Sequence, residues 1–128
     1  MAELRLGDTG VPIYVQLRDQ YLRAIGAGLM KPGDQMPTMR QVAVALKVDL
    51  NTVRRAYDEL ERLGAVTLVR GRGSFVAEPP PAMEGLAHDT EIDRLAHQTL
   101  AAAAAAGVDP VALAQRIAAL AAEKEKTR

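Results

Sequence analysis

The chain has 128 residues, of which 48% are hydrophobic and 3% aromatic, with no cysteine and equal numbers of basic and acidic side chains. These values predict one small domain, or one with an appendage, built on an aliphatic core, and they exclude disulfides and thiolate metal sites. We expect a cytoplasmic protein, because no apolar run reaches the roughly 18 residues of a membrane span and the N-terminus lacks a signal-peptide pattern. Residues 31–72 carry eight basic and five acidic side chains, so any polyanion site is expected there.

Two helices joined by a turn are expected in residues 12–47. Pro12 suits the first turn of a helix, since its fixed φ angle fits and its missing N–H has no partner to lose. This helix should end near Gly28. Thr38 with Gln41 three residues later matches a capping box, which predicts a second, short helix over 38–47.

The third expected helix, residues 50–63, is the element around which we interpret the chain. Asp49 can accept the free N–H groups of its first turn, and Gly64 can end it in the left-handed conformation. Apolar residues recur on one face at helical spacing: Val53, Ala56, Tyr57, Leu60 and Leu63. A short helix followed within a few residues by a second, capped helix is the helix-turn-helix pattern.

Two runs rich in β-branched residues, 65–69 and 74–77, are separated by a short loop that contains glycine. This spacing predicts a β-hairpin, and a helix-turn-helix followed by a hairpin is a winged helix. The proline run 79–81 then predicts a stiff linker. We therefore expect a mainly α fold: an α+β winged helix-turn-helix domain over 1–78, a proline-rich linker over 79–88 and a two-helix dimerisation segment over 89–128.

The two C-terminal helices are predicted to begin at Thr90 and at Asp109-Pro110, with Gly107 between them. Two helices beyond a linker bury little by themselves, so we expect them to pair with those of a second chain in a four-helix interface. Packing back onto the winged helix is the alternative. The residues expected at the dimer interface are Ile92, Leu95, Leu100, Leu113, Ile117 and Leu120.

The chemistry that this pattern indicates is recognition of double-stranded DNA. Arginine and asparagine match the edges of guanine and adenine in the major groove, and backbone N–H groups and basic side chains contact phosphate. The candidate DNA-binding residues are Arg40, Asn51, Thr52, Arg54, Arg55, Arg70, Gly71 and Arg72. We expect that the protein is not an enzyme and binds no cofactor, because the sequence has no nucleophile–base pair and no nucleotide-binding glycine motif. We expect no metal site, because His88 and His97 have no third ligand at a suitable spacing.

Residues 12–76 resemble the GntR family of bacterial transcription regulators. The matching segments are PIYVQLRDQYLRAI from residue 12, GLMKPGDQMPTMRQVA from 28, VDLNTVRRAYDEL from 48 and GRGSFV from 71. The short C-terminal part is similar to the YtrA-like subfamily, which has two helices instead of a large effector domain. The resemblance implies a dimeric DNA-binding repressor whose DNA contacts include Arg40, Asn51, Thr52, Arg54, Arg70 and Gly71. The family usually has arginine in the slot of Leu50, so altered base readout is implied, with Leu50 free to touch a thymine methyl.

We favour a sequence-specific transcription regulator that acts as a homodimer on an inverted-repeat operator. The alternative is a winged-helix module that binds protein and not DNA, which the zero net charge and the apolar Leu50 motivate. A small-molecule inducer of unknown identity is a further hypothesis. It would bind at the dimer interface or between the two parts of the chain. The stiff proline linker would then change the separation of the two DNA-binding domains of the dimer.

Overall fold

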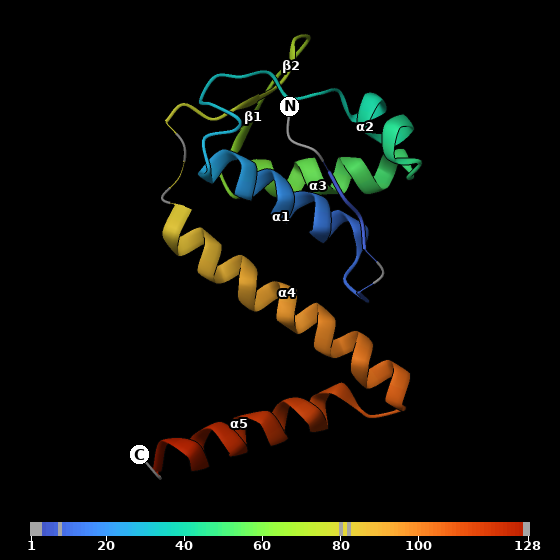
Figure 1. The fold of residues 1–128 in the computed structure, drawn as a ribbon, viewed down its shortest axis with the longest axis vertical. Helices are drawn as coiled ribbons and strands as arrows, with labels where there is room; N and C mark the ends of the chain where they lie inside the picture. The colour runs from blue at the N-terminus through green and yellow to red at the C-terminus, as the bar shows by residue number, and fades with distance from the viewer. Residues whose placement is uncertain (1–3, 8, 80, 82, 127–128) are drawn as a thin grey trace.

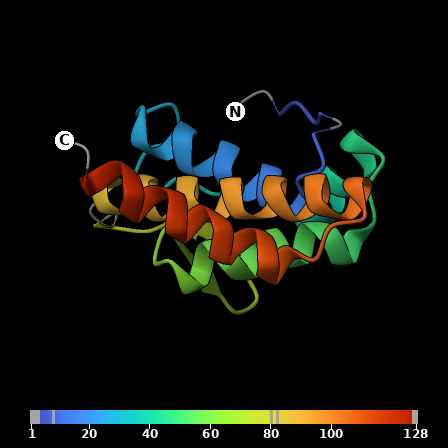
Figure 2. The same cartoon turned by 90° about the horizontal axis from the view of Figure 1, so that it is seen from below.

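The computed structural model describes residues 4–7, 9–79, 81 and 83–126. In these ranges the elements are α1 (Ile13–Gly26), α2 (Met39–Leu46), α3 (Leu50–Arg62), β1 (Val66–Val69), β2 (Gly73–Val76), α4 (Met83–Ala106) and α5 (Pro110–Lys126). Helices α1 to α3 and the hairpin pack together, α4 crosses beside α1, and α5 runs back below α4 and diverges from it (Figure 1). Seen from below, α5 is the outermost element (Figure 2). The predicted mainly α fold with a hairpin wing is confirmed.

Local capping side chains set the ends of α2 and α3. Thr38 and Gln41 form the predicted reciprocal capping box at the start of α2. Asp49 caps α3 by accepting a hydrogen bond from the backbone N–H of Asn51 at 2.8 Å. Gly64 follows α3 with a φ angle of 79°, which ends the helix as predicted. Each of these contacts satisfies a backbone group that the helix itself leaves unpaired.

The wing is an antiparallel hairpin that is fastened to the loop before α2. Strands β1 and β2 pair in register from Val66–Val76 to Val69–Gly73. The N–H of Met36 donates to the carbonyl of Ser74 at 2.8 Å, and the N–H of Gly33 donates to the carbonyl of Val76 at 2.9 Å. These hydrogen bonds hold the wing in place against the helix-turn-helix.

The hydrophobic core lies between α1, α3 and the wing. Leu17 and Tyr21 of α1 and Val53 and Leu60 of α3 are fully buried there. The rings of Tyr21 and Tyr57 meet edge to face, with centroids 5.8 Å apart. Because these side chains occupy one face of α3, its other face is left for solvent or for a partner.

Helix α4 begins earlier than the sequence predicts, at Met83 and not at Thr90, so residues 83–88 are helical and not part of a linker. Met83 and Leu86 pack against the core of the winged helix, and their burial favours helix at this end. The Thr90 hydroxyl does not cap a helix start but donates to the Ala87 carbonyl inside the helix at 3.2 Å. The start of α5 is as predicted, because the Asp109 carboxylate accepts the N–H of Val111 at 3.1 Å.

Helix α4 presents two different faces. One face packs against α1, so the alternative of packing back onto the winged helix holds for this face of α4. Five of the six predicted interface residues are exposed, and Leu113 is half-buried; the exposed ones are Ile92, Leu95, Leu100, Ile117 and Leu120.

Pro80 and Ala82 of the expected linker and residues 1–3, 8 and 127–128 of the expected domains lie outside the described residues. Among the helices in the described part of the chain, none combines the length and the apolar character that a membrane span requires.

Candidate nucleic-acid interface

The exposed face of α3 carries the first group of predicted DNA-binding side chains. Asn51 and Arg54 are exposed near the N-terminus of the helix, and Thr52 is half-buried beside them. A guanidinium nitrogen of Arg54, Nη1, donates to Oδ1 of Asn51 at 3.2 Å. This hydrogen bond places two base-reading side chain types together on one side of the helix start. The opposite side of α3 is held in the core, so the orientation of this pair follows from the fold.

The second group lies on α2 and on the turn that leads to α3. Arg40 is exposed in the first turn of α2. Lys47 is also exposed and takes the left-handed conformation, with a φ angle of 56°, at the end of α2. We did not predict Lys47 as a site residue, although a lysine in the turn of a helix-turn-helix is a signal for a phosphate contact. The hydroxyl of Tyr57 donates to the carbonyl of Pro37 at 2.6 Å, which fixes α3 to the segment that precedes α2.

The third group lies at the tip of the wing. Arg70, Gly71 and Arg72 are exposed in the turn between β1 and β2. Gly71 has a φ angle of 79°, a conformation that side chains other than glycine rarely adopt. The side-chain amide of Gln35 donates to the backbone carbonyl of Arg72 at 3.0 Å and braces the turn. Gln35 is a support that sequence reasoning missed, since the pairing of its segment with the wing is a tertiary feature.

The structure places Arg55 and Leu50 apart from the Asn51–Arg54 pair. The guanidinium carbon of Arg55 lies 3.9 Å from the ring centroid of Tyr14 of α1, a cation–π contact. Leu50 is half-buried and packs against the hydrophobic core. A DNA contact by Arg55 and a thymine contact by Leu50 stay predictions. Either contact would have to coexist with the packing that the side chain already makes.

Two of the three groups lie on elements that face away from the C-terminal helices. The tip of the wing and α2 lie in the upper part of Figure 1, whereas α4 and α5 lie below α1. A duplex bound to α2, α3 and the wing would therefore leave α4 and α5 free for other contacts.

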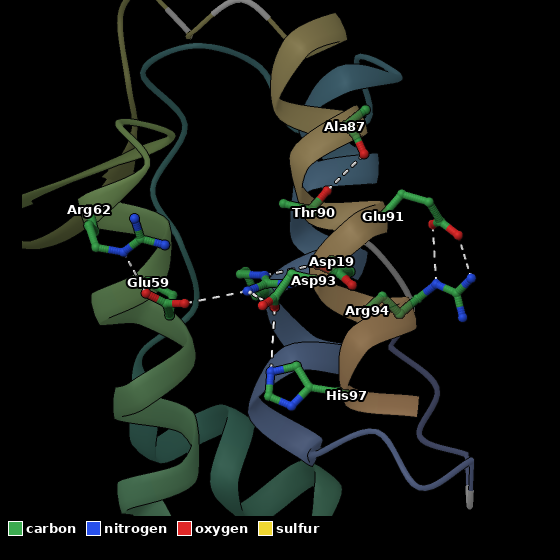
Figure 3. A network of polar contacts seen from close by, with 10 residues as sticks. Asp19, Glu59, Arg62, Ala87, Thr90, Glu91, Asp93, Arg94 and His97 are labelled. Atoms are coloured by element: carbon green, nitrogen blue, oxygen red, sulfur yellow. Dashed lines mark hydrogen bonds and ion pairs between the residues drawn. The ribbon is translucent and has the colours of Figure 1, made fainter. Parts of the chain in front are cut away.

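A charge cluster around the buried side chain of Arg18 joins α1, α3 and α4 (Figure 3). The guanidinium of Arg18, only 2% exposed, lies 2.9 Å from Asp19, 3.0 Å from Asp93 of α4 and 3.4 Å from Glu59 of α3. Burial would lower the pKa of Arg18, but its hydrogen bonds and attraction to Asp19 and Asp93 raise it. Burial raises the pKa of Asp19. A hydrogen bond from Arg62 lowers the pKa of Glu59.

The sequence held a signal for this cluster that we did not use. Arg18 comes four residues after Tyr14 and three before Tyr21, so it lies on the side of α1 that carries these two aromatic residues, a side expected to face the core. A charged residue at a core position needs a partner, and in this chain the partners come from three helices.

Replacing Glu59 with glutamine is expected to flatten the acid side of the stability profile. The folded-state pKa of Glu59 lies below its ordinary value of 4.5, so its stabilisation is present above about pH 4.5 and is lost as the pH falls through the folded-state value. The free energy of unfolding of Glu59→Gln should therefore change less between about pH 5 and pH 3 than that of the wild type. Urea unfolding at a series of pH values measures this. Glu61→Gln, at an exposed position of α3, is the control, and an equal slope for Glu59→Gln and wild type would contradict the assignment.

Residues 13–76, half of the chain, match the family described as bacterial regulatory proteins, gntR family. The chain belongs to the GntR family. A similar relative is the HTH-type transcriptional repressor YtrA of Bacillus subtilis (strain 168), which is 41% identical over 70 residues. The match covers 55% of this chain and 54% of that repressor, so it spans only about half the length of the relative.

Two solved structures resemble this member of the GntR family. YtrA from Sulfolobus acidocaldarius, a GntR-family transcription factor, is 30% identical with a TM-score of 0.52, and the match covers 75% of this chain and 96% of that one. The DNA-binding domain of AraR in complex with operator ORX1 is 27% identical with a TM-score of 0.51, and the match covers 60% and 93%. The predicted family and its YtrA-like character are confirmed, and the family is one of transcription regulators and not of enzymes.

Proposed function

We propose that this GntR regulator binds an inverted-repeat operator as a homodimer and represses transcription there. DNA-binding transcription regulation is the function that its family and relatives share. The observation that carries the proposal is the exposed Asn51–Arg54 pair at the start of α3, on a helix whose other face is locked in the core. The AraR domain with the same fold was solved with an operator, and the repressor role follows the names of the relatives.

The homodimer is supported by the exposed apolar side chains of α4 and α5. Leu100 of α4 and Ile117 of α5 are 51% and 50% exposed in the single chain. Covering such side chains contributes about 25 cal/mol for each Å² of apolar surface removed from water. A two-fold dimer also matches an inverted repeat, because each subunit then presents one α3 to one half-site.

We further propose that a small-molecule inducer binds between the winged helix and α4. A pocket of about 780 Å³ lies there, a volume in the range of small-molecule sites. Its apolar lining includes Leu22, Met83 and Leu86, and its charged lining consists of two arginines, Arg23 and Arg94, and two acids, Asp19 and Glu91. A ligand with an apolar body and a polar group that can bind both basic and acidic side chains fits this mixture.

The proposal is tested by measuring how the purified chain binds its own promoter fragment as the salt concentration rises. Specific operator binding should fall steeply with salt, since phosphate contacts release counterions. Replacing Arg54 with alanine should weaken binding by about 1–3 kcal/mol, roughly 5- to 150-fold, and relax the preference at one base position. Arg116→Ala, at an exposed position of α5, is the matched control and should bind as the wild type does.

The alternative, a module that binds protein and not DNA, predicts a different outcome. In that case the promoter fragment is not bound even at low salt, or binding does not respond to salt. Wild-type affinity of Arg54→Ala for the operator would remove the reading role of α3 from the proposal.

A further inference from the structure

The charge cluster around the buried Arg18 connects α4 to α3, the helix proposed to read DNA. Figure 3 shows Asp19, Glu59 and Asp93 converging from α1, α3 and α4. Each of these carboxylates forms an ion pair with the guanidinium of Arg18. The Arg18–Asp93 distance of 3.0 Å bridges α1 to α4, and the Arg18–Glu59 distance of 3.4 Å bridges α1 to α3. Both ion pairs connect the helices through side chains and are independent of the backbone segment that joins the wing to α4.

The cluster favours one relative arrangement of the three helices. An arginine that is 2% exposed has lost its hydration, so moving a carboxylate away from it leaves a buried charge with less compensation. The planar guanidinium also restricts the directions from which carboxylates can approach. A shift of α4 against α1 therefore costs more here than it would across a purely apolar contact.

A second set of contacts runs parallel to the first. Nε2 of His97 lies 3.6 Å from Oδ2 of Asp93 on α4. The His97 ring meets Tyr14 of α1 edge to face, with centroids 6.3 Å apart. Tyr14 in turn lies under the guanidinium of Arg55, four residues before Glu59 on α3. Helix α4 is thus connected to two successive turns of the reading helix.

We propose that Arg18 and Asp93 are positioning residues that set the half-site spacing this regulator reads. They hold α4, and with it the second chain that we propose to pair with α4 and α5, at a fixed orientation to α3. The separation of the two α3 helices in the dimer then depends on this ion pair and not only on the proline segment. The inference rests on the proposed homodimer, because a single chain has no spacing to set.

The first experiment measures operator spacing. Wild type, Asp93→Ala and Asp93→Glu are titrated with inverted repeats whose half-sites are moved apart or together in single base-pair steps, and with an isolated half-site. We expect Asp93→Ala to lose about fivefold or more of the discrimination between preferred and altered spacing, with unchanged half-site affinity and dimer dissociation. Asp93→Glu should restore part of the discrimination. Asp89→Ala, one turn earlier and exposed on α4, should behave as the wild type does.

The second experiment needs no DNA. The chain contains no cysteine, so Glu61→Cys at an exposed position of α3 accepts a single spin label in each subunit. Pulsed electron paramagnetic resonance then measures the distance between the two α3 helices. In the labelled Glu61→Cys chain we expect a narrow distribution of interspin distances. Adding Asp93→Ala should broaden this distribution, whereas adding Asp89→Ala should leave it narrow.

The outcomes separate the inference from the function on which it rests. A folded Asp93→Ala dimer with wild-type spacing discrimination and a narrow interspin distance overturns the inference alone. The inference is also overturned if Asp93→Ala lowers half-site affinity or dimer affinity by as much as it lowers spacing discrimination. Asp93 would then act on stability and not on position. If the labelled Glu61→Cys chain shows no interspin distance and the wild-type chain binds no inverted repeat, the homodimer fails and the inference fails with it.

Discussion

Replacing Ile117 with aspartate is expected to convert the homodimer into a monomer and to weaken operator binding by about 10²- to 10⁴-fold. Ile117 lies on α5 and is half exposed in the single chain, as is Leu120 one turn later. A carboxylate in an apolar contact loses its hydration without gaining a partner. A chain that cannot pair engages one half-site at a time and loses the effective concentration that its partner provides.

Sedimentation velocity and operator titration measure the two parts of this prediction. Gln115→Asp is the matched control, because it adds the same charge to an exposed position about 200° around the same helix. It should leave both association and affinity unchanged. If Ile117→Asp remains a dimer with wild-type affinity, the second chain does not pair through this part of α5.

Replacing Leu60 with alanine is expected to lower the free energy of unfolding by about 2–5 kcal/mol. Leu60 is fully buried where α3 meets the core, so the shorter side chain removes apolar contacts and leaves a cavity. Domains of this size are stable by only about 5–15 kcal/mol, so the loss is a large part of the total. Operator affinity should fall as well, since α3 is the element that carries Asn51 and Arg54.

Urea unfolding followed by circular dichroism measures the loss. Leu68→Ala is the control, because Leu68 is 57% exposed on β1 and its truncation creates no cavity. It should change the free energy of unfolding by no more than about 0.5 kcal/mol. Equal losses for the two leucines would mean that α3 does not pack against the core as described.

The local structure of the helix-turn-helix could be predicted because it depends on neighbours in sequence. The capping box of Thr38 with Gln41, the Asp49 cap and the stop at Gly64 each act within a few residues. The same is true of the start of α5 at Asp109. The exposed positions of Asn51 and Arg54 followed from the apolar stripe on the other face of α3, since helical spacing alone separates the two faces.

The start of α4 could not be read locally. The segment from Thr90 carries acids in its first turn and matches a helix start, and nothing nearby in the sequence marks Met83. What decides the boundary is the burial of Met83 and Leu86 against a core that consists of residues far away in the chain. Burial of apolar surface can outweigh weak local preferences for a helix start.

By itself, the sequence determined the winged helix, the family and the face of α3 that is exposed to solvent, because caps, turns and apolar spacing depend on residues close together in the chain. Only the tertiary structure decided how α4 lies against the winged helix and which side chains hold it there. Arg18, Glu59 and Asp93 are separated by tens of residues, and their charges matter because the fold removes Arg18 from water. An ion pair of this kind depends on three-dimensional proximity and on burial, and neither can be read from spacing along one chain.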